Sequence, residues 1–401
     1  MMNREELSAY VLKQITKNNP NVALMAGTGV GKTKIALDIV NKFKCKKILV
    51  LIAERAHKKN WEEEIAKWYP KLKGVEFFCY ASMHKLEDKY DIILYDECHH
   101  LGTEKRLSYL QRLHPKFRVF LSATLSPQFL TTLEYLLGIR ITRVKYSLQD
   151  AIDSNILRKP QINLIPLELN NKASDDEIIE SWGKEKLRKK LQCTYREVWS
   201  CTSPIFKKGN PNVELHIKCT QAQHYEYLTK KMDYYKRNFE MYRSEIMKNR
   251  WLQYGSRRKR FLGELKTEEV KRLLDYLGSK RFICFCTSIN QANELGGENA
   301  IHSKSDNKAL EDFNNLKSDK LFAVGMLQEG MNLKNIEVGI IVQLDGQELR
   351  FIQKSGRVYR ADNPVQYIFY YKNTRDEEYL AKALEGINSE YVKEFSYEDN
   401  N

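Results

Sequence analysis

The sequence has 401 residues and lacks any apolar run that approaches the length of a membrane-spanning segment. Its first residues, Met-Met-Asn-Arg-Glu-Glu, are polar and lack the apolar segment of a signal peptide. No fixed-period repeat is visible either. We therefore expect a cytoplasmic protein with no membrane contact, long enough for two or three globular domains and acting as a monomer.

A regular cysteine framework is also lacking. The eight cysteines are scattered over positions 45, 79, 98, 193, 201, 219, 284 and 286, a distribution that suits a reducing compartment. A zinc site made of Cys193, Cys201, His216 and Cys219 is conceivable, but the spacing matches no short paired-ligand pattern. We therefore expect free thiols.

Nearly all of the excess of basic over acidic residues lies in one quarter of the chain. Residues 181–280 hold 24 Lys and Arg against 11 Asp and Glu, a balance of +13 out of a net charge of +14. Such a concentration predicts a polyanionic partner, namely nucleic acid, although a charge run alone is also compatible with a solvated helical face. We expect the densest cluster to be the main electrostatic grip on that partner: Arg257, Arg258, Lys259 and Arg260.

Glycines are concentrated where a phosphate is to be bound. Residues 26–33 read Ala-Gly-Thr-Gly-Val-Gly-Lys-Thr, a phosphate-binding loop with alanine at its first position. The residues expected to wrap the phosphates with their backbone N–H groups are Gly27, Thr28, Gly29, Val30 and Gly31. Lys32 would reach the β- and γ-phosphates, and the Thr33 hydroxyl would ligate Mg²⁺. A chance glycine turn is the alternative, but the preceding apolar run and following helical pattern favour nucleoside triphosphate binding.

Short apolar runs alternate with helical patterns in two parts of the sequence. In the first part we predict strands at 21–26, 47–53, 75–80, 92–95 and 118–121. In the second we predict strands at 281–286, 321–324, 338–344 and 366–371. The pattern predicts an α/β protein of two parallel-sheet domains, 1–157 and 158–401, with a basic, mainly helical insertion at about 171–262 in the second.

The insertion carries an aromatic and apolar periodicity. Steps of three and four residues connect Tyr225, Leu228, Met232, Tyr235, Phe239, Tyr242 and Ile246. They predict one face of a long amphipathic helix, which we interpret as a packing face in preference to a base-stacking surface. A basic turn is expected to follow over residues 251–260.

Candidate catalytic residues occur at two places: directly after a predicted strand, and within a later segment that is expected to be helical. Asp96 can hold Mg²⁺, and Glu97 is placed to orient and deprotonate an attacking water. Arg357 and Arg360 lie three residues apart, so on a helix they share a face and could supply cations to the γ-phosphate. An ordinary basic surface helix is the alternative for these arginines taken alone.

Together these segments resemble superfamily 2 helicases and translocases. Motifs I, II, III, V and VI correspond to residues 26–33, 96–99 (Asp-Glu-Cys-His), 122–124 (Ser-Ala-Thr), 330–333 and 353–360. The segment Asn60–Trp68 resembles the one after motif Ia in Swi/Snf-type translocases. A helical insertion before motif IV at 282–287 points the same way.

The resemblance implies two RecA-like domains with ATP and Mg²⁺ in the cleft, and it adds Gln353 and Gly356 to the nucleotide contacts. It also implies a nucleic-acid strand touched by Arg55, Tyr80, Ser82, Thr287, His302 and Ser303. Two positions depart from the family pattern. The adenine-reading glutamine expected in the Tyr10-Val11 region is missing, with Gln14 nearby but off register, and Val324 stands near a position usually occupied by threonine. We therefore expect weak discrimination between nucleotide bases.

The sequence thus predicts an ATP-hydrolysing nucleic-acid motor, with DNA favoured over RNA as its partner. A DNA helicase or translocase that acts on branched or duplex DNA is the leading hypothesis. The alternatives are an RNA helicase and a nucleotide-gated DNA clamp, such as the motor part of a larger restriction or repair assembly.

Overall fold

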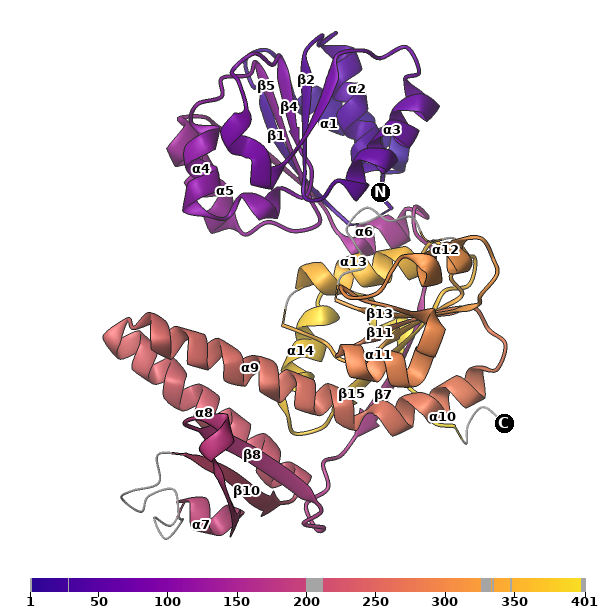
Figure 1. The fold of residues 1–401 in the computed structure, drawn as a ribbon. Helices are drawn as coiled ribbons and strands as arrows, with labels where there is room; N and C mark the ends of the chain where they lie inside the picture. Colours follow the sequence, from indigo (N-terminus) through magenta and orange to yellow (C-terminus); the bar gives the residue numbers. More distant parts are fainter. Residues whose placement is uncertain are drawn as a thin grey trace. The chain divides into compact units, whose positions relative to one another are not determined.

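The computed structural model describes residues 2–27, 29–199, 212–325, 333, 335–346 and 348–397, with only the main chain described at Ala56 and at 348–350. The chain divides into two compact units. Unit 1 comprises Met1–Ile165, Leu274–Ile368 and Glu378–Asn401, and unit 2 comprises Pro166–Leu273 and Phe369–Glu377. Unit 1 contains two separate β-sheets, whereas unit 2 contains a smaller sheet and a pair of long helices (Figure 1).

The first sheet of unit 1 is parallel throughout, in the order β3-β2-β4-β5-β1-β6. Its strands are β1 (Asn21–Ala26), β2 (Ile48–Ile52), β3 (Val75–Cys79), β4 (Ile92–Tyr95), β5 (Phe117–Ser122) and β6 (Thr142–Tyr146). The central strands are fully buried because both sheet faces are covered, which explains their continuous apolar sequences. The five strands predicted for this part are confirmed. The edge strand β6 was not predicted, since its sequence Thr-Arg-Val-Lys-Tyr is half polar.

Helices cover both faces of this sheet. In Figure 1, α1 (Arg4–Gln14), α2 (Lys32–Lys42) and α3 (Ala56–Trp68) lie on one face, and α4 (Glu104–Leu110) and α5 (Pro127–Leu137) lie on the other. A sixth helix, α6 (Leu148–Asp153), follows β6. Adjacent strands β4, β5 and β1 carry motifs II, III and I immediately after their carboxyl ends. The order of the sheet therefore brings three distant sequence segments to one edge.

The second sheet has the strand order β12-β13-β11-β14-β15-β7-β16. Its strands are β7 (Gln161–Leu167), β11 (Phe282–Cys286), β12 (Ala300–Ile301), β13 (Lys320–Val324), β14 (Val338–Ile341), β15 (Val365–Tyr371) and β16 (Val392–Glu394). The helices of this part are α10 (Thr267–Leu277), α11 (Ile289–Gly296), α12 (Lys308–Asn314), α13 (Glu348–Val358) and α14 (Arg375–Ala383). The four predicted strands are confirmed, and β14 ends three residues earlier than predicted. The fold is therefore α/β, with two parallel-sheet bodies.

Unit 2 is built on a three-stranded sheet and a helical hairpin. The strands β8 (Asp176–Trp182), β10 (Val213–Cys219) and β9 (Lys189–Thr194) pair in that order, and the short α7 (Tyr195–Trp199) follows β9. The long helices α8 (Gln221–Tyr242) and α9 (Glu245–Leu265) run side by side in opposite directions (Figure 1). The insertion is thus helical as predicted, but it also contains a sheet that was not predicted.

The helical hairpin corrects two predictions. The predicted single helix ends at Tyr242, because Arg243 adopts a left-handed conformation with φ 51°, and Ile246 belongs to α9. The predicted basic turn at 251–260 is wrong, since these residues lie in the middle of α9. The interpretation of the aromatic stripe as a packing face is confirmed for Tyr235 and Phe239. Their rings stack on Tyr254 and Trp251, with centroids 5.4 and 6.0 Å apart.

The free thiols expected from the sequence are confirmed for six cysteines that the structure describes: Cys45, Cys79, Cys98, Cys219, Cys284 and Cys286. No helix in the part of the chain that the structure describes has the length and apolar content needed to cross a membrane.

Candidate nucleotide site

The glycine loop joins β1 to α2 and has the backbone shape of an anion cradle. Gly29 and Gly31 have φ values of 89° and 104°, a left-handed region that favours glycine. At Gly29 an added Cβ would also lie 2.7 Å from the Arg360 Nε, so the guanidinium would have to shift away from the loop. Helix α2 begins at Lys32, and no described side chain caps its N-terminus. Its first N–H groups therefore remain available to an anion.

Lys32 connects this loop to motif II. Its Nζ donates a hydrogen bond of 2.9 Å to the Ala26 carbonyl oxygen and lies 3.6 Å from the Glu97 Oε1. The side chains of Lys32 and Glu97 are only 10% and 9% exposed. A cation and a carboxylate therefore face each other beside the loop, where water is largely excluded.

Glu97 is held in an uncommon conformation. Its φ is 46°, a left-handed value that costs free energy for a residue with a Cβ. Its Oε2 is buried and accepts no hydrogen bond from the described residues, although the His99 Nδ1 lies 3.5 Å away. A buried carboxylate oxygen with unused acceptor capacity is suited to receive a proton from water.

Asp96 is fixed by two aromatic side chains. The Trp61 Nε1 donates to the Asp96 Oδ2 at 2.9 Å, and the Tyr80 hydroxyl donates to the Asp96 carbonyl oxygen at 2.7 Å. Trp61 and Tyr80 are each 2% exposed. The sequence did not assign this positioning role to either residue. The only signal for it was a tryptophan in the segment that resembles Swi/Snf-type translocases.

Motif II is also linked to motif III. The His99 Nδ1 lies 3.3 Å from the Ser122 Oγ, which in turn donates to the Thr124 carbonyl oxygen at 2.9 Å. Ser122 ends β5 and is fully buried. His99 therefore lies between the Glu97 carboxylate and the loop after β5.

Two arginines approach the glycine loop from different elements. The Arg4 Nη2 donates to the Gly29 carbonyl oxygen at 2.9 Å, and Arg360 lies against Gly29 as described above. Burial lowers the pKa of the Arg360 guanidinium, and the nearby charge of Arg4 lowers it further, whereas Glu64 opposes the shift. Two cations held close together against their mutual repulsion create a site that favours a polyanion. Arg4 was not predicted from the sequence.

The prediction that Arg357 and Arg360 share one helix face is wrong. Helix α13 ends at Val358, so Arg360 lies two residues beyond it. Arg357 and Gln353 remain inside the helix, 8% and 6% exposed. Gly356 lies in the same helix.

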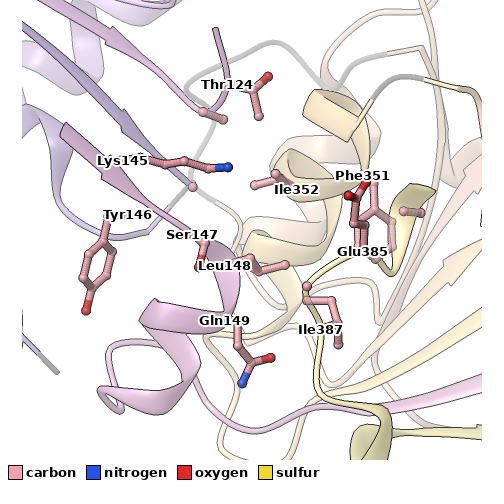
Figure 2. A pocket seen from close by; sticks show the side chains of 14 residues that line it. Thr124, Lys145, Tyr146, Ser147, Leu148, Gln149, Phe351, Ile352, Glu385 and Ile387 are labelled. Carbon is pink, nitrogen blue, oxygen red and sulfur yellow. The ribbon is translucent and has the colours of Figure 1, made fainter. Parts of the chain in front are cut away.

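A cavity of about 330 Å³ adjoins the loop within unit 1. Gly27, Thr124 and the segment 145–149 line it together with Phe351 and Ile352 of α13 (Figure 2). Its wall combines the apolar side chains of Leu148 and Ile352 with the ammonium of Lys145. Residues of motifs I, III and the start of the motif VI helix therefore share one solvent-accessible space.

These residues fit a nucleoside triphosphate with Mg²⁺. The glycine cradle, the uncapped helix start and two converging arginines match a chain of phosphates. Thr33 and Asp96 would hold the metal, since hydroxyl and carboxylate oxygens suit Mg²⁺. Thr28 and residues 330–332 of motif V lie outside the described residues.

The predicted nucleic-acid contacts differ in how exposed their side chains are. Arg55, Ser303 and Arg260 are exposed, and Ser82, His302 and Lys259 are partly exposed. The side chain of Tyr80 is buried beneath Asp96, and the Thr287 hydroxyl is buried without a hydrogen-bond partner among the described residues. These two side chains therefore need a local rearrangement before they can touch a strand.

Two of the four residues in the predicted basic cluster, Arg257 and Arg258, make contacts within unit 2. The Arg257 Nη1 donates to the Glu180 Oε1 at 3.0 Å, and Arg258, 4% exposed, donates to the Thr229 Oγ1 at 3.3 Å. Because α9 places successive residues around its circumference, a run of four cations cannot all face solvent.

Two family models match this chain, and they fall on its two ends. "Type III restriction enzyme, res subunit" matches residues 3–79, and "Helicase conserved C-terminal domain" matches residues 265–362. Together with the motif geometry above, these two domain matches support a superfamily 2 helicase. Members of this group are ATP-hydrolysing enzymes.

A curated relative from Methanocaldococcus jannaschii carries the provisional name ATP-dependent RNA helicase. It is 30% identical over 119 residues, which is 29% of this chain and 14% of that protein. The chain thus matches only a small part of the relative's length.

Two solved structures are similar over most of the chain. The Pyrococcus furiosus Hef helicase domain has 14% identity and a TM-score of 0.49, covering 95% of this chain and 99% of its own. The Sulfolobus solfataricus SWI2/SNF2 ATPase core, solved with double-stranded DNA, has 14% identity and a TM-score of 0.34. The match covers 96% of this chain and 90% of the ATPase core. The fold assignment rests on the sheet topology, because similarity at this level is too low to support it.

Proposed function

We propose that the chain is an ATP-dependent motor that moves along, or remodels, branched or duplex DNA. The observation that carries this proposal is the meeting of Lys32, Glu97 and Arg360 at one glycine loop. Phosphoryl transfer needs such a set, because its barrier is lowered mainly by positioning and by fixed charge.

Each residue has a defined task in this proposal. Lys32 exchanges its bond to the Ala26 carbonyl for a phosphate oxygen, and the Glu97 Oε2 takes the proton from the attacking water. Arg360 places its guanidinium against the charge that develops in the transition state. Thr33 and Asp96 would hold Mg²⁺, which would neutralise phosphate charge at this site.

Nucleic acid is the partner that the charge distribution supports. The excess of +13 in residues 181–280 falls almost entirely within unit 2, which supports a backbone-binding role for that unit. The Swi/Snf-like segment Asn60–Trp68 supports DNA as the substrate. We further propose a monomeric, cytoplasmic protein.

An RNA helicase is the second candidate, because the curated relative carries that name. A third is a DNA clamp that hydrolyses ATP without separating strands. Both alternatives use the same nucleotide site as the proposed DNA motor. They differ from it in the nucleic acid that stimulates ATP hydrolysis, or in whether hydrolysis is coupled to movement or strand separation.

An ATPase panel distinguishes these functions. Turnover of the purified chain is measured with single-stranded, duplex and forked DNA and with matched RNA, alongside strand separation and translocation. We expect stimulation by DNA together with movement or strand separation. Stimulation by RNA alone would support the second candidate, and DNA stimulation without either activity the third. Turnover equal to that of the Lys32→Ala variant under every condition would contradict the proposed function.

A further inference from the structure

Unit 2 contains a cluster of three different ligand types at the end of its small sheet. Asp176 is the first residue of β8, and Cys219 is the last residue of β10. The two are direct partners in the antiparallel register of these strands. His224 lies in the first turn of α8, which begins at Gln221. Thr220, the N-cap of this helix, directly follows β10.

The side chains converge closely enough to share one ion. One ligand atom from each residue lies within 4.8 Å of the others, and the His224 Nδ1 is 3.1 Å from the Asp176 Oδ2. The His224 ring is held in place by Phe261, with ring centroids 4.1 Å apart. A rigidly placed imidazole reduces the ordering that a ligand would otherwise have to impose.

The cluster is buried on one side and open on the other. Cys219 is fully buried in the apolar core of unit 2, whereas the side chains of His224 and Asp176 are 14% and 22% exposed. A cation can therefore enter from the solvent side and reach the sulfur at the inner end. A remaining coordination position would face water.

We propose that Asp176, Cys219 and His224 form a binding site for one zinc-type divalent cation. The sulfur, nitrogen and oxygen donors match the preference of Zn²⁺, whereas Mg²⁺ and Ca²⁺ take oxygen ligands. The site is therefore chemically separate from the oxygen ligands Thr33 and Asp96 at the glycine loop. It also differs from the zinc site weighed from the sequence, with which it shares only Cys219.

Among the described residues, the polar contact between members of this cluster is the one from the His224 Nδ1 to the Asp176 Oδ2. Burial raises the pKa of the Cys219 thiol to about 12, and the charges of Asp176 and Glu177 add to this effect. The thiol therefore keeps its proton until a metal displaces it. The alternative explanation is a hydrogen-bonded pair beside a protonated thiol that binds no metal, and the experiment below distinguishes it from a metal-binding site.

The position gives the metal a structural consequence. Two strand ends and the start of α8 meet at the cluster, so a bound ion would tie the sheet to the helical hairpin. Since the cation binds only the folded arrangement, it stabilises unit 2 in proportion to its concentration relative to its dissociation constant. We expect the thermal unfolding temperature to rise when Zn²⁺ is added to chelator-treated protein.

Cobalt provides the direct probe of this site. Co²⁺ is titrated into the chelator-treated full chain, and the thiolate-to-cobalt charge-transfer absorption is recorded. We expect one equivalent to produce the band, because the thiolate participates. Cys219→Ser should abolish the band, and Asp176→Asn should weaken Co²⁺ binding by at least about tenfold, the lower range for altered metal-site partners. Circular dichroism and DNA-independent turnover establish that both variants are folded.

Two cysteine variants serve as controls. Cys193 is buried in the same apolar core but is not part of the converging group, so Cys193→Ser should keep the band and the Zn²⁺-dependent stabilisation. Cys284 and Cys286 have sulfur atoms 3.8 Å apart, so Cys284→Ser tests binding by that pair. Absence of the band in the unaltered protein would overturn the proposal. Its persistence in Cys219→Ser, or its loss only in Cys284→Ser, would do the same.

Discussion

At the scale of single residues, Glu97 combines backbone strain, burial and an unused acceptor oxygen. Such strain persists only where the surroundings over-determine a conformation. Here the hydrogen bonds from Trp61 and Tyr80 fix the neighbouring Asp96. The strained turn thereby sends the two adjacent carboxylates in different directions, one suited to a metal and the other to a water.

The first prediction concerns Glu97→Gln. The amide keeps the shape of the side chain but cannot accept a proton, so turnover should fall by about 10²–10⁴-fold, the usual contribution of a general base. ATP affinity should change little, because the phosphate contacts remain. Steady-state ATPase and equilibrium nucleotide binding measure the two effects. Glu104→Gln, an exposed position in α4, should leave both unchanged. Unaltered turnover in Glu97→Gln would remove Glu97 from the catalytic role.

A second prediction concerns Arg360. Arg360→Ala should lower kcat by about 10²-fold or more while changing ATP affinity much less, because the cation is assigned to the transition state. Arg360→Lys should restore little, since an ammonium cannot reproduce the planar fork of the guanidinium. Arg158→Ala, whose side chain is 57% exposed, is the matched surface control. A pure loss of ATP affinity in Arg360→Ala would instead assign Arg360 to ground-state binding.

At the scale of secondary-structure elements, the sequence predicted the buried strands best. Strand β4 was predicted with its observed bounds, because a short apolar run flanked by polar residues has few other solutions. Strands β8 and β9 carry several charges and were hidden within the basic composition of the insertion. Strand β10 did carry a signal, since Val213, Leu215 and Ile217 alternate with polar residues and are buried.

The residues of the candidate site also divide into those that the sequence predicted and those that it did not. Motif residues that directly follow buried strands, such as Asp96, were predicted because strand order brings them to one edge of the sheet. The contacts of Arg4 and Trp61 were not predictable, since they depend on helices whose positions relative to the loop are set by tertiary packing. Arg258 was misassigned because composition reports the number of charges, not the helix face on which each one lies.

A buried ion pair at the junction of α9 and α10 gives a prediction for stability. The Lys266 Nζ lies 2.6 Å from the Asp376 Oδ2 and donates to the Phe369 carbonyl at 3.1 Å, with both side chains fully buried. Burial lowers the pKa of Lys266, and Asp376 opposes this shift. Lys266→Met should reduce the free energy of unfolding by about 3–5 kcal/mol, because an uncompensated carboxylate remains buried.

Urea unfolding of a double-mutant cycle tests this interpretation. Combining Lys266→Met with Asp376→Leu should recover much of the loss, since neither charge is then buried. Lys271→Met removes a cation whose partner Glu268 is exposed, so it should cost less than about 1 kcal/mol. A single-variant loss as small as that of Lys271→Met would show that the buried pair contributes little.

At the scale of the whole molecule, the basic excess remains in the inserted region, but the structure changes which residues can grip a partner. Arg258 is buried and donates to Thr229, whereas Arg257, with 34% of its side chain exposed, pairs with Glu180. The exposed arginines are distributed along the α8–α9 hairpin: Arg237, Arg243, Arg250 and Arg260. An alanine replacement of 257–260 as a block would therefore mix loss of packing with loss of binding.

Replacing Arg237, Arg243, Arg250 and Arg260 with alanine isolates the electrostatic effect. Each arginine that neutralises a phosphate of duplex DNA contributes about 0.9 to the slope of log affinity against log salt, so removing all four cations should flatten the slope by about 3–4 units. Affinity should fall similarly for all sequences, since phosphates carry no base information. Turnover without nucleic acid should survive, because the residues at the glycine loop are untouched.

Arg258→Ala is the contrasting variant: its buried guanidinium should affect the stability of unit 2 and leave the slope of the folded protein unchanged. An unaltered slope in the quadruple variant would show that the hairpin is a solvated surface and that other parts of the chain hold the nucleic acid.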